Sequence, residues 1–271
     1  METNAYLKEH YEKGGENGRL LSRHGRIEFL TTVRYVEKYL HEGMKIIEIG
    51  AGTGRYSHYF AKQGYTVDAV ELINYNIEVF KQNTVHGEAV TIKQGNALNL
   101  SYYPDNTYDI TLLLGPMYHL YTKEDQQKAL SEAIRITKKG GIVFASYCNN
   151  DATIVQFGFV KGNILHEMEK GMIDPITFKC KSTPVEVFEL YTKSEIDELI
   201  AHFKVKRLHY VGTDMATNFI KDTVDAMDDK TYDVYLRYHF SICERSDLIG
   251  ATHHMLDISK RNDFYEFTRF Y

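Results

Sequence analysis

The chain has 271 residues, a net charge of −5, and a composition of 43% hydrophobic and 25% charged residues. These values indicate an ordinary globular protein with one sizeable core and appended elements, and the lack of a dense lysine and arginine run argues against binding to DNA or RNA. The cysteines, Cys148, Cys180 and Cys243, lie far apart without C-x-x-C spacing, which argues for a reducing compartment and against a disulfide framework or a zinc site.

The first 18 residues are polar and carry no apolar leader, and they end in Lys13-Gly14-Gly15-Glu16-Asn17-Gly18, which is expected to be a flexible, turn-rich stretch. No apolar run approaches the roughly 18 residues that a membrane span needs, which predicts a cytoplasmic protein without membrane contact. Residues 19–40 have apolar side chains at helical spacing and are predicted to form a helix on the core. Most of its arginines are expected on the solvated face, but Arg19 or Arg26 could reach a carboxylate in a ligand cleft.

A glycine-rich loop follows the first predicted strand. Lys45–Ile49 is a short, mostly β-branched run that predicts a buried strand, and glycines at positions 50, 52 and 54 lead from it into an amphipathic helical pattern. Glycine permits positive φ and lets a ligand lie against the main chain, beside the positive end of the helix. This order indicates a cofactor site. The dinucleotide pattern G-x-G-x-x-G would need glycine where Arg55 stands, which disfavours a nicotinamide cofactor.

The second predicted strand, Thr66–Glu71, ends in a carboxylate. Ligands bind beyond the carboxyl ends of the strands in open parallel sheets, so Glu71 is placed to accept hydrogen bonds from two ribose hydroxyls. Leu72 could pack on a purine face. The alternatives are that Glu71 is a charge favoured at a helix N-terminus and that Leu72 belongs to the core.

Two more predicted strands end in polar or aromatic loops. Residues 89–94 precede Gly95-Asn96-Ala97-Leu98, and residues 108–114 precede Gly115-Pro116-Met117-Tyr118-His119-Leu120. Loops after parallel strands meet at one edge of the sheet, so we expect these two loops near the glycines and Glu71. Asn96 could also be a simple turn residue.

Two motifs make the chain similar to a known family. The E-x-G-x-G-x-G pattern from Glu48 to Gly54 resembles motif I of class I S-adenosylmethionine-dependent methyltransferases, and G-P-x-Y-H-L resembles the methyltransferase type 11-like subfamily. The resemblance implies an α/β fold, with a Rossmann-like, seven-stranded, mostly parallel sheet, helices on both faces and helical cap insertions over the cleft. It also implies S-adenosylmethionine as the cofactor, and methyl transfer to a small-molecule acceptor by in-line displacement.

The resemblance places the cofactor contacts at the first strand, the glycine loop and the ends of the next three strands. The family usually has aspartate where this chain has Asn96, and the amide oxygen can accept the same hydrogen bond from the adenine amine without the charge. The expected cofactor-binding residues are Glu48, Gly50, Ala51, Gly52, Gly54, Glu71, Leu72, Asn96, Ala97, Leu98, Leu114 and Arg26.

The remaining segments are predicted to surround this core. Residues 1–43 form a helical lead-in, and residues 44–148 form the cofactor-binding core with a fifth strand at 141–148. Residues 149–191 follow that strand without a core pattern of their own, so we expect a cap insertion over the cleft. Residues 192–271 complete the sheet with strands at 205–211 and near 252–259, and helices at 213–245 are inserted between them.

Methyl transfer from a sulfonium needs no protein nucleophile, so we expect catalysis mainly by positioning in a dry cleft. His119 is the candidate general base; the alternative is that it only forms a hydrogen bond to the backbone of the cap. Tyr118 either positions the acceptor or is an ordinary packing residue. The adjacent His253 and His254 would point to opposite faces of a strand, so we expect no metal site with Asp257. The acceptor and oligomeric state stay open, and two rivals remain: a non-catalytic S-adenosylmethionine- or nucleotide-binding regulator, and an NAD-dependent oxidoreductase.

Overall fold

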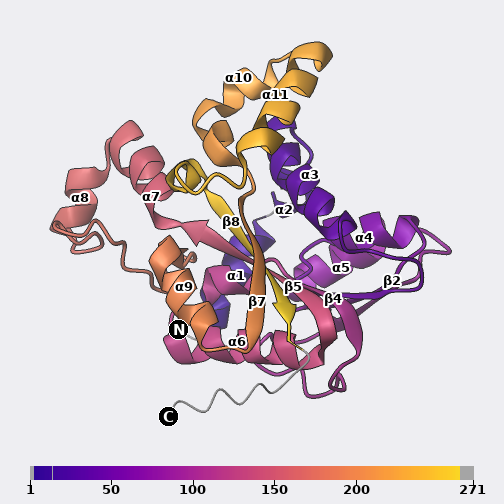
Figure 1. Cartoon of the computed structure of the whole chain (residues 1–271). Coiled ribbons are helices and arrows are strands. Elements are labelled where there is room, and N and C mark those ends of the chain that lie inside the picture. The colour runs from indigo at the N-terminus through magenta and orange to yellow at the C-terminus, as the bar shows by residue number, and fades with distance from the viewer. Residues whose placement is uncertain (1–2, 14, 263–271) are drawn as a thin grey trace, which may run out of the picture.

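The computed structural model describes residues 3–13 and 15–262, which fold around one twisted sheet (Figure 1). Its strand order is β3-β2-β1-β4-β5-β8-β7, and the short β6 pairs with the end of β5. Strands β1 to β5 pair in parallel, whereas β8 runs antiparallel to β5 and β7. The strands are β1 (Lys45–Ile49), β2 (Thr66–Glu71), β3 (Val90–Gln94), β4 (Tyr108–Leu113), β5 (Thr137–Asn149), β6 (Leu190–Tyr191), β7 (Val205–Gly212) and β8 (His254–Arg261). The predicted Rossmann-like, mostly parallel sheet is confirmed.

Helices cover both faces of this sheet, as a parallel sheet requires. Apolar side chains of α3 and α4 pack on one face, and those of α6 and α9 pack on the other. The α-helices are α1 (Thr3–Glu12), α2 (Glu16–Arg19), α3 (Arg23–Glu37), α4 (Arg55–Lys62), α5 (Asn74–Asn83), α6 (Lys123–Ile136), α7 (Asn150–Thr153), α8 (Ile164–Glu169), α9 (Lys193–Ala201), α10 (Lys221–Asp225) and α11 (Asp229–Ile242). Within the described residues, no helix has the length and apolar character to cross a bilayer.

The central strand β1 shows why the sequence pattern predicts this architecture. Ile46 belongs to the core cluster under α3 and α4, whereas Ile47 and Ile49 belong to the cluster under α6. Side chains alternate between the faces of a strand, so a strand with buried isoleucines at successive positions has a core on each side. All three isoleucines are buried.

The strand order reverses between β1 and β4, which are neighbours in the sheet but not in the chain. At such a reversal the loops that follow the two strands diverge and leave a crevice at the carboxyl edge of the sheet. The glycine loop follows β1 here, and the 3₁₀ turn η1 (Pro116–His119) follows β4. The fold therefore brings both sequence motifs to one place.

The N-terminal segment contains a helix that the sequence pattern did not single out. Thr3–Glu12 form α1, which lies near α5 and buries Leu7. The helix predicted at 19–40 is also interrupted: α2 ends at Arg19, and α3 starts after Ser22, whose hydroxyl accepts a hydrogen bond from the Gly25 amide at 3.1 Å. A helix of ten residues such as α1 is marginal without its partner surface, and its few apolar side chains give a weak periodic pattern.

Two insertions lie toward the carboxyl edge. The first follows β5 and contains α7, the π-helical turn η2 (Ile154–Val160) and α8; the second follows β7 and contains η3 (Met215–Ile220), α10, α11 and η4 (Ile249–Ala251). Figure 1 shows α10 and α11 beside α3, where Ile27 packs with Val224 and Tyr232. The fifth strand is longer than predicted because it begins at Thr137, which pairs with the start of β4, and the last strand begins at His254.

Candidate active site

The glycine loop after β1 needs its glycines for two separate reasons. Gly50, Gly52 and Gly54 have φ of 76°, 54° and 90°, which is the left-handed region that glycine adopts without strain. A Cβ on Gly50 would lie 2.5 Å from Cδ of Pro116, and one on Gly54 would lie 2.5 Å from the Phe80 ring. The loop therefore packs tightly against Pro116 and Phe80, with no room for a side chain at Gly50 or Gly54.

Glu71, at the end of β2, supports this loop directly. Its Oε2 accepts the Gly52 amide at 2.7 Å, and its Oε1 accepts the Ile73 amide at 2.8 Å. The carboxylate is buried, and this burial raises its pKa. Since Ile73 caps α5, Glu71 lies both at a helix N-terminus and at the edge of the crevice.

Glu48, within β1, connects the strand to the first turn of α4. Its Oε2 accepts the Ser57 amide at 2.9 Å and also the Ser57 hydroxyl. Burial raises the pKa of Glu48 to about 8, although the bonds from Ser57 act in the opposite direction. The buried carboxyl therefore orients α4 relative to the glycine loop.

The first cavity, here named the sheet-edge cavity, has a volume of about 500 Å³. It lies over the ends of β1, β2 and β3, and its lining includes Gly50, Glu71, Leu72, Asn96, Ala97 and Leu98. The amide oxygen of Asn96 accepts the Leu98 backbone N–H at 2.9 Å, so this side chain shapes the loop after β3. Six of the twelve predicted cofactor residues meet here.

A second, smaller space of about 190 Å³ lies beside the first and is named the junction cavity. It shares Gly50, Gly115 and Tyr11 with the sheet-edge cavity. Glu48, Ala51 and Leu114 of the predicted set line it, as does Tyr118. Gly52 and Gly54 line neither cavity and act through the shape of the loop.

The two arginines considered for the cleft have different positions. Arg26 is exposed on α3 and lines neither cavity, so the structure does not support its predicted cofactor contact. The reason is its place beside Ile27, which is buried against α10 and α11. Arg19 does line the junction cavity, and its guanidinium binds both oxygens of Glu28, at 2.6 and 3.2 Å.

His119 lies in the wall of the sheet-edge cavity, with both ring nitrogens engaged. Nδ1 contacts the carbonyl of Val187 at 2.8 Å, and since a carbonyl only accepts, Nδ1 carries the proton and Nε2 accepts from the Tyr11 hydroxyl at 2.9 Å. Burial lowers the pKa of His119 to about 4. The ring is thus neutral at pH 7 and connects η1 to the cap and to α1.

Tyr118 points the other way, toward the middle of the sheet. Its hydroxyl donates to Ser146 Oγ at 2.7 Å, and its ring centre lies 6.0 Å from that of His254. The ring is buried and forms one wall of the junction cavity. Its position allows it to shape the space in which the reaction partners would meet.

A third cavity, of about 620 Å³, lies under the first insertion and is named the cap cavity. Its apolar lining includes Ile154, Phe157, Met172 and Ile173. Phe188 and His254 line both this cavity and the junction cavity. The three spaces therefore form a series, with the junction cavity in the middle.

Sequence reasoning missed several of these residues. Leu7 and Tyr11 of α1 line the sheet-edge cavity, and their i, i+4 spacing was the available signal. Phe188 belongs to the cap, which has no periodic pattern. His254 was considered only for a metal, and its partners Asp214 and Glu28 carried no motif.

Three comparisons show which known proteins this chain is similar to. Residues 47–145 match a family described as a methyltransferase domain. A ubiquinone biosynthesis O-methyltransferase of Rickettsia typhi is 27% identical over 242 residues, which cover 83% of this chain and 86% of that protein. A demethylmenaquinone methyltransferase of Thermobifida fusca is 32% identical over 113 residues, which cover 41% of this chain and 45% of that protein.

Among solved structures, an S-adenosylmethionine-dependent methyltransferase of Methanosarcina mazei has the same fold, with a TM-score of 0.56 at 16% identity, over 84% of this chain and 98% of that chain. This chain thus has a sheet order with a reversal at β1 and β4, a left-handed glycine loop and an acidic residue at the end of β2. Its sequence is also similar to methyltransferases. The chain is therefore similar to S-adenosylmethionine-dependent methyltransferases, and the family match covers residues 47–145.

Proposed function

We propose that this protein transfers a methyl group in line to a small aromatic acceptor that binds in the cap cavity. The observation that carries the proposal is the series of three cavities. The junction cavity shares Gly50 and Gly115 with the sheet-edge cavity, and Phe188 and His254 with the cap cavity. A donor on one side and an acceptor on the other would meet in this small space from opposite directions, as an in-line displacement requires.

The residues of the sheet-edge cavity are suited to S-adenosylmethionine, which supplies an electrophilic methyl group when it is bound. The cavity has a volume in the usual range for small-molecule sites, roughly 300–1,000 Å³. Gly50 and Gly54 let the loop pack against Pro116 and Phe80, where a Cβ would clash, and this packing sets the shape of the loop beside the cavity. Glu71 would bind the sugar hydroxyls, and Leu72 and Ala97 offer apolar surface to the base. Ala51, Leu114 and Glu48 would contact the remainder from the junction cavity.

The chain's own contribution to the rate would be orientation and exclusion of water. Well-oriented intramolecular reactions reach effective molarities of about 10⁵–10⁸ M. His119 has both nitrogens engaged and a low pKa, which supports its role in holding α1 and the cap over the cofactor rather than the role of general base. Tyr118 would position the acceptor at the junction cavity.

We also assign the chain to the subfamily with the G-P-x-Y-H-L motif, because each motif residue has a separate structural function. A Cβ on Gly115 would approach the Gly50 carbonyl oxygen to 3.2 Å, and Pro116 packs against Gly50. Tyr118 binds Ser146, and His119 binds Val187. The motif therefore positions the glycine loop, the sheet and the cap relative to one another.

The acceptor class is supported by the relatives and by the lining of the cap cavity. The two curated relatives are named for ubiquinone biosynthesis and for demethylmenaquinone, which are quinone chemistry. Apolar side chains such as Ile154, Phe157 and Ile173 would pack against a flat ring. An acceptor of this kind would leave its reactive substituent directed to the junction cavity.

The proposal is tested by binding and turnover together. We expect S-adenosylhomocysteine at millimolar concentration to raise the melting temperature, and S-adenosylhomocysteine to be released from S-adenosylmethionine with hydroxylated aromatic acceptors. Glu71→Gln should weaken cofactor binding about 10- to 100-fold, since a hydrogen bond to a charged group contributes about 1.5–3 kcal/mol. Glu78→Gln, at an exposed ion pair on α5, is the matched control. A melting temperature that responds to NAD alone, or release only with non-aromatic acceptors, would overturn the proposal.

A further inference from the structure

His254 occupies the boundary between the junction cavity and the cap cavity. It is the first residue of β8, opposite Cys148 of β5, and 21% of its side-chain surface is exposed. Its two acidic neighbours are more buried, with 3% of the side chain exposed for Asp214 and 10% for Glu28. The imidazole is therefore the accessible member of a buried charged group.

Asp214 holds one side of the imidazole ring. Its Oδ2 lies 2.7 Å from Nδ1 of His254, and the carboxylate also accepts the Thr252 hydroxyl at 2.6 Å, the His253 amide at 2.8 Å and the Asn218 side-chain amide at 2.7 Å. Burial alone would raise the pKa of Asp214, but the charge of His254 and its hydrogen bond lower it to about 2. Asp214 is thus an ionised group with a defined orientation.

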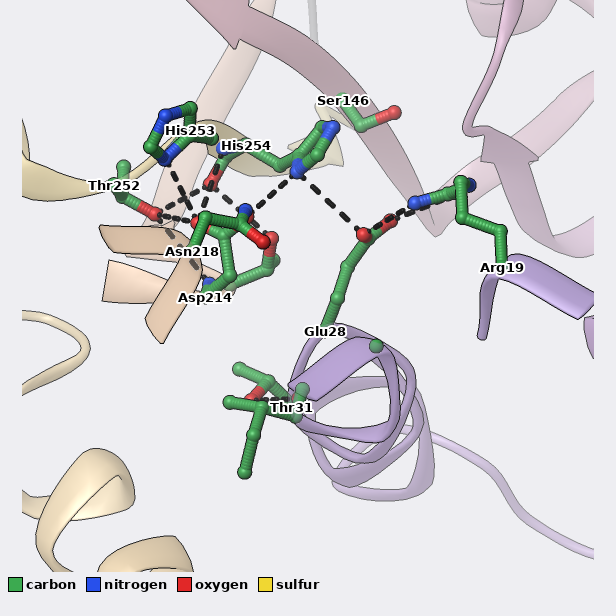
Figure 2. Close-up of polar contacts among 12 residues, drawn as sticks. Arg19, Glu28, Thr31, Ser146, Asp214, Asn218, Thr252, His253 and His254 are labelled. Carbon is green, nitrogen blue, oxygen red and sulfur yellow. Dashed lines mark hydrogen bonds and ion pairs between the residues drawn. The ribbon is translucent and has the colours of Figure 1, made fainter. Parts of the chain in front are cut away.

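Glu28 approaches the same ring nitrogen from α3, as Figure 2 shows. Its Oε2 lies 3.5 Å from Nδ1 of His254, while Arg19 binds both Glu28 oxygens from the opposite side. Two carboxylates thus face one guanidinium and one imidazole. A metal ion placed among Glu28, Asp214 and His254 would compete with Arg19 for the same carboxylate, so the arrangement favours proton chemistry.

The second ring nitrogen, Nε2, has a different environment. In Figure 2 it is turned away from Asp214 and Glu28 and lies on the side of Ser146. The groups that face the ring from the packed elements are Tyr118 of η1 and Cys148 of β5, in addition to the two carboxylates, Arg19 beyond Glu28 and the neighbouring His253. Burial would lower the pKa of His254, but the charges of Glu28 and Asp214, together with side-chain hydrogen bonds to Asp214 and Cys148, outweigh it and raise the pKa well above the usual value.

We propose that His254 is the catalytic base of the methyl transfer, positioned by Asp214 and Glu28, and that the acceptor group is the hydroxyl of a phenol or a hydroxylated quinol. This inference rests on the proposed function. The acceptor oxygen forms a bond to the methyl carbon while the sulfur–carbon bond breaks and its electron pair returns to sulfur. The hydroxyl proton moves to Nε2 of the neutral ring, and the resulting imidazolium, stabilised by both carboxylates, releases it to water after product release.

The wall of the cap cavity adds a second requirement on the acceptor. Within the described residues, neither ring nitrogen of the buried His253 has a hydrogen-bond partner, and neither does Oε1 of Gln156. Both residues line the cap cavity. Buried polar atoms without partners are costly, so these atoms match a ligand that carries a second polar substituent, such as another hydroxyl or a carbonyl on the ring.

The first experiment measures the proton affinity of His254 by histidine NMR on the protein loaded with S-adenosylhomocysteine. The signal that is lost in His254→Gln should titrate above the usual value, and Asp214→Asn should lower its pKa by about one unit or more, because an opposite charge has been removed. Asp225→Asn is the matched control, since Asp225 binds His24 in a similar pair at 2.7 Å, on the surface between α10 and α3. An unchanged His254 pKa in Asp214→Asn would contradict the positioning role.

The second experiment measures S-adenosylhomocysteine release with a panel of mono- and dihydroxylated benzenes and their amino and thiol analogues. His254→Gln should lower kcat about 100-fold or more and leave the affinity for S-adenosylhomocysteine unchanged, whereas Asp225→Asn should change neither. In the wild type kcat/KM should rise with pH through the pKa of His254, and Asp214→Asn should move that rise to lower pH.

Several results would overturn the inference. Full activity of His254→Gln, or kcat/KM that falls as pH rises through this pKa, would show that His254 is not the base. The proposed methyl transfer would not be affected by that result. Turnover restricted to amine or thiol acceptors would remove the hydroxyl class and again leave the transferase function intact. No release from any acceptor of the panel, whether hydroxylated, amino or thiol, with S-adenosylhomocysteine still bound, would overturn the inference and the proposed function together.

Discussion

The cofactor side and the acceptor side of this active site are assembled in opposite ways. The sheet-edge cavity, which is the proposed cofactor side, is lined mostly by one continuous stretch between β1 and η1, where the lining residues lie at the ends of strands or in the loops directly after them. The proposed acceptor side joins Arg19, Glu28, Cys148, Asp214 and His254 from separate parts of the chain. Backbone geometry defines the first side, and a balance of charges defines the second. Such a division lets one fold keep its donor site while the acceptor changes.

The largest expected effect is that of Gly50→Ala, which tests whether backbone geometry defines the cofactor side. The new Cβ would lie 2.5 Å from Pro116 at a φ of 76°, so the loop must move. We expect the affinity for S-adenosylmethionine to fall about 100-fold, which is about 3 kcal/mol. Titration calorimetry measures this loss. Gly64→Ala is the control, because its φ is 91° but nothing lies within 4 Å of the added Cβ; equal affinities in the two variants would show that the contact with Pro116 is unimportant.

A smaller effect concerns the buried charge of Glu48. Its pKa in the folded protein is about 8, above the ordinary 4.5, so the folded state holds a proton that the unfolded state has lost. The associated stability is fully present below about pH 4.5 and is lost as pH rises through about 8. We expect Glu48→Gln to remove this dependence, with a difference on the order of 1–3 kcal/mol between pH 5 and pH 9.

Urea unfolding of the ligand-free protein at the two pH values measures this effect. Glu42→Gln, at an exposed position before β1, is the comparison variant and should retain the wild-type dependence. A wild-type protein whose stability does not decline between pH 5 and pH 9 would refute the prediction. This pH dependence therefore tests the buried carboxyl of Glu48 beside the glycine loop separately from the charged residues around His254.

The smallest effect lies where α1 covers the sheet-edge cavity. Tyr11→Phe removes the hydroxyl that donates to Nε2 of His119 at 2.9 Å and leaves that nitrogen without this partner. We expect the dissociation rate of S-adenosylhomocysteine to rise several-fold, because one such hydrogen bond contributes about 0.5–1.5 kcal/mol. Stopped-flow measurement decides this, with Tyr238→Phe on the exposed face of α11 as control. A rate equal to that of the control would mean that α1 does not hold the cofactor.

Much of the cofactor side was predictable because its constraints are local. A buried strand, left-handed glycines and a following helix occur within one short stretch, and the end of β2 follows from the same periodicity. The prediction for Arg26 failed because helical spacing alone does not say which face of α3 meets α10 and α11. Asn96 shows both expected features, since it lines the cavity and also forms a turn with Leu98.

The sequence by itself determined the α/β order, the glycine loop and the acidic strand end, since each depends on neighbours only a few residues away. The tertiary structure alone decided that Asp214 and Glu28 meet at Nδ1 of His254, and that α1 closes the sheet-edge cavity. These contacts join elements far apart in the chain. Their formation depends on how the two insertions pack on the sheet, and no local pattern of residues encodes that packing.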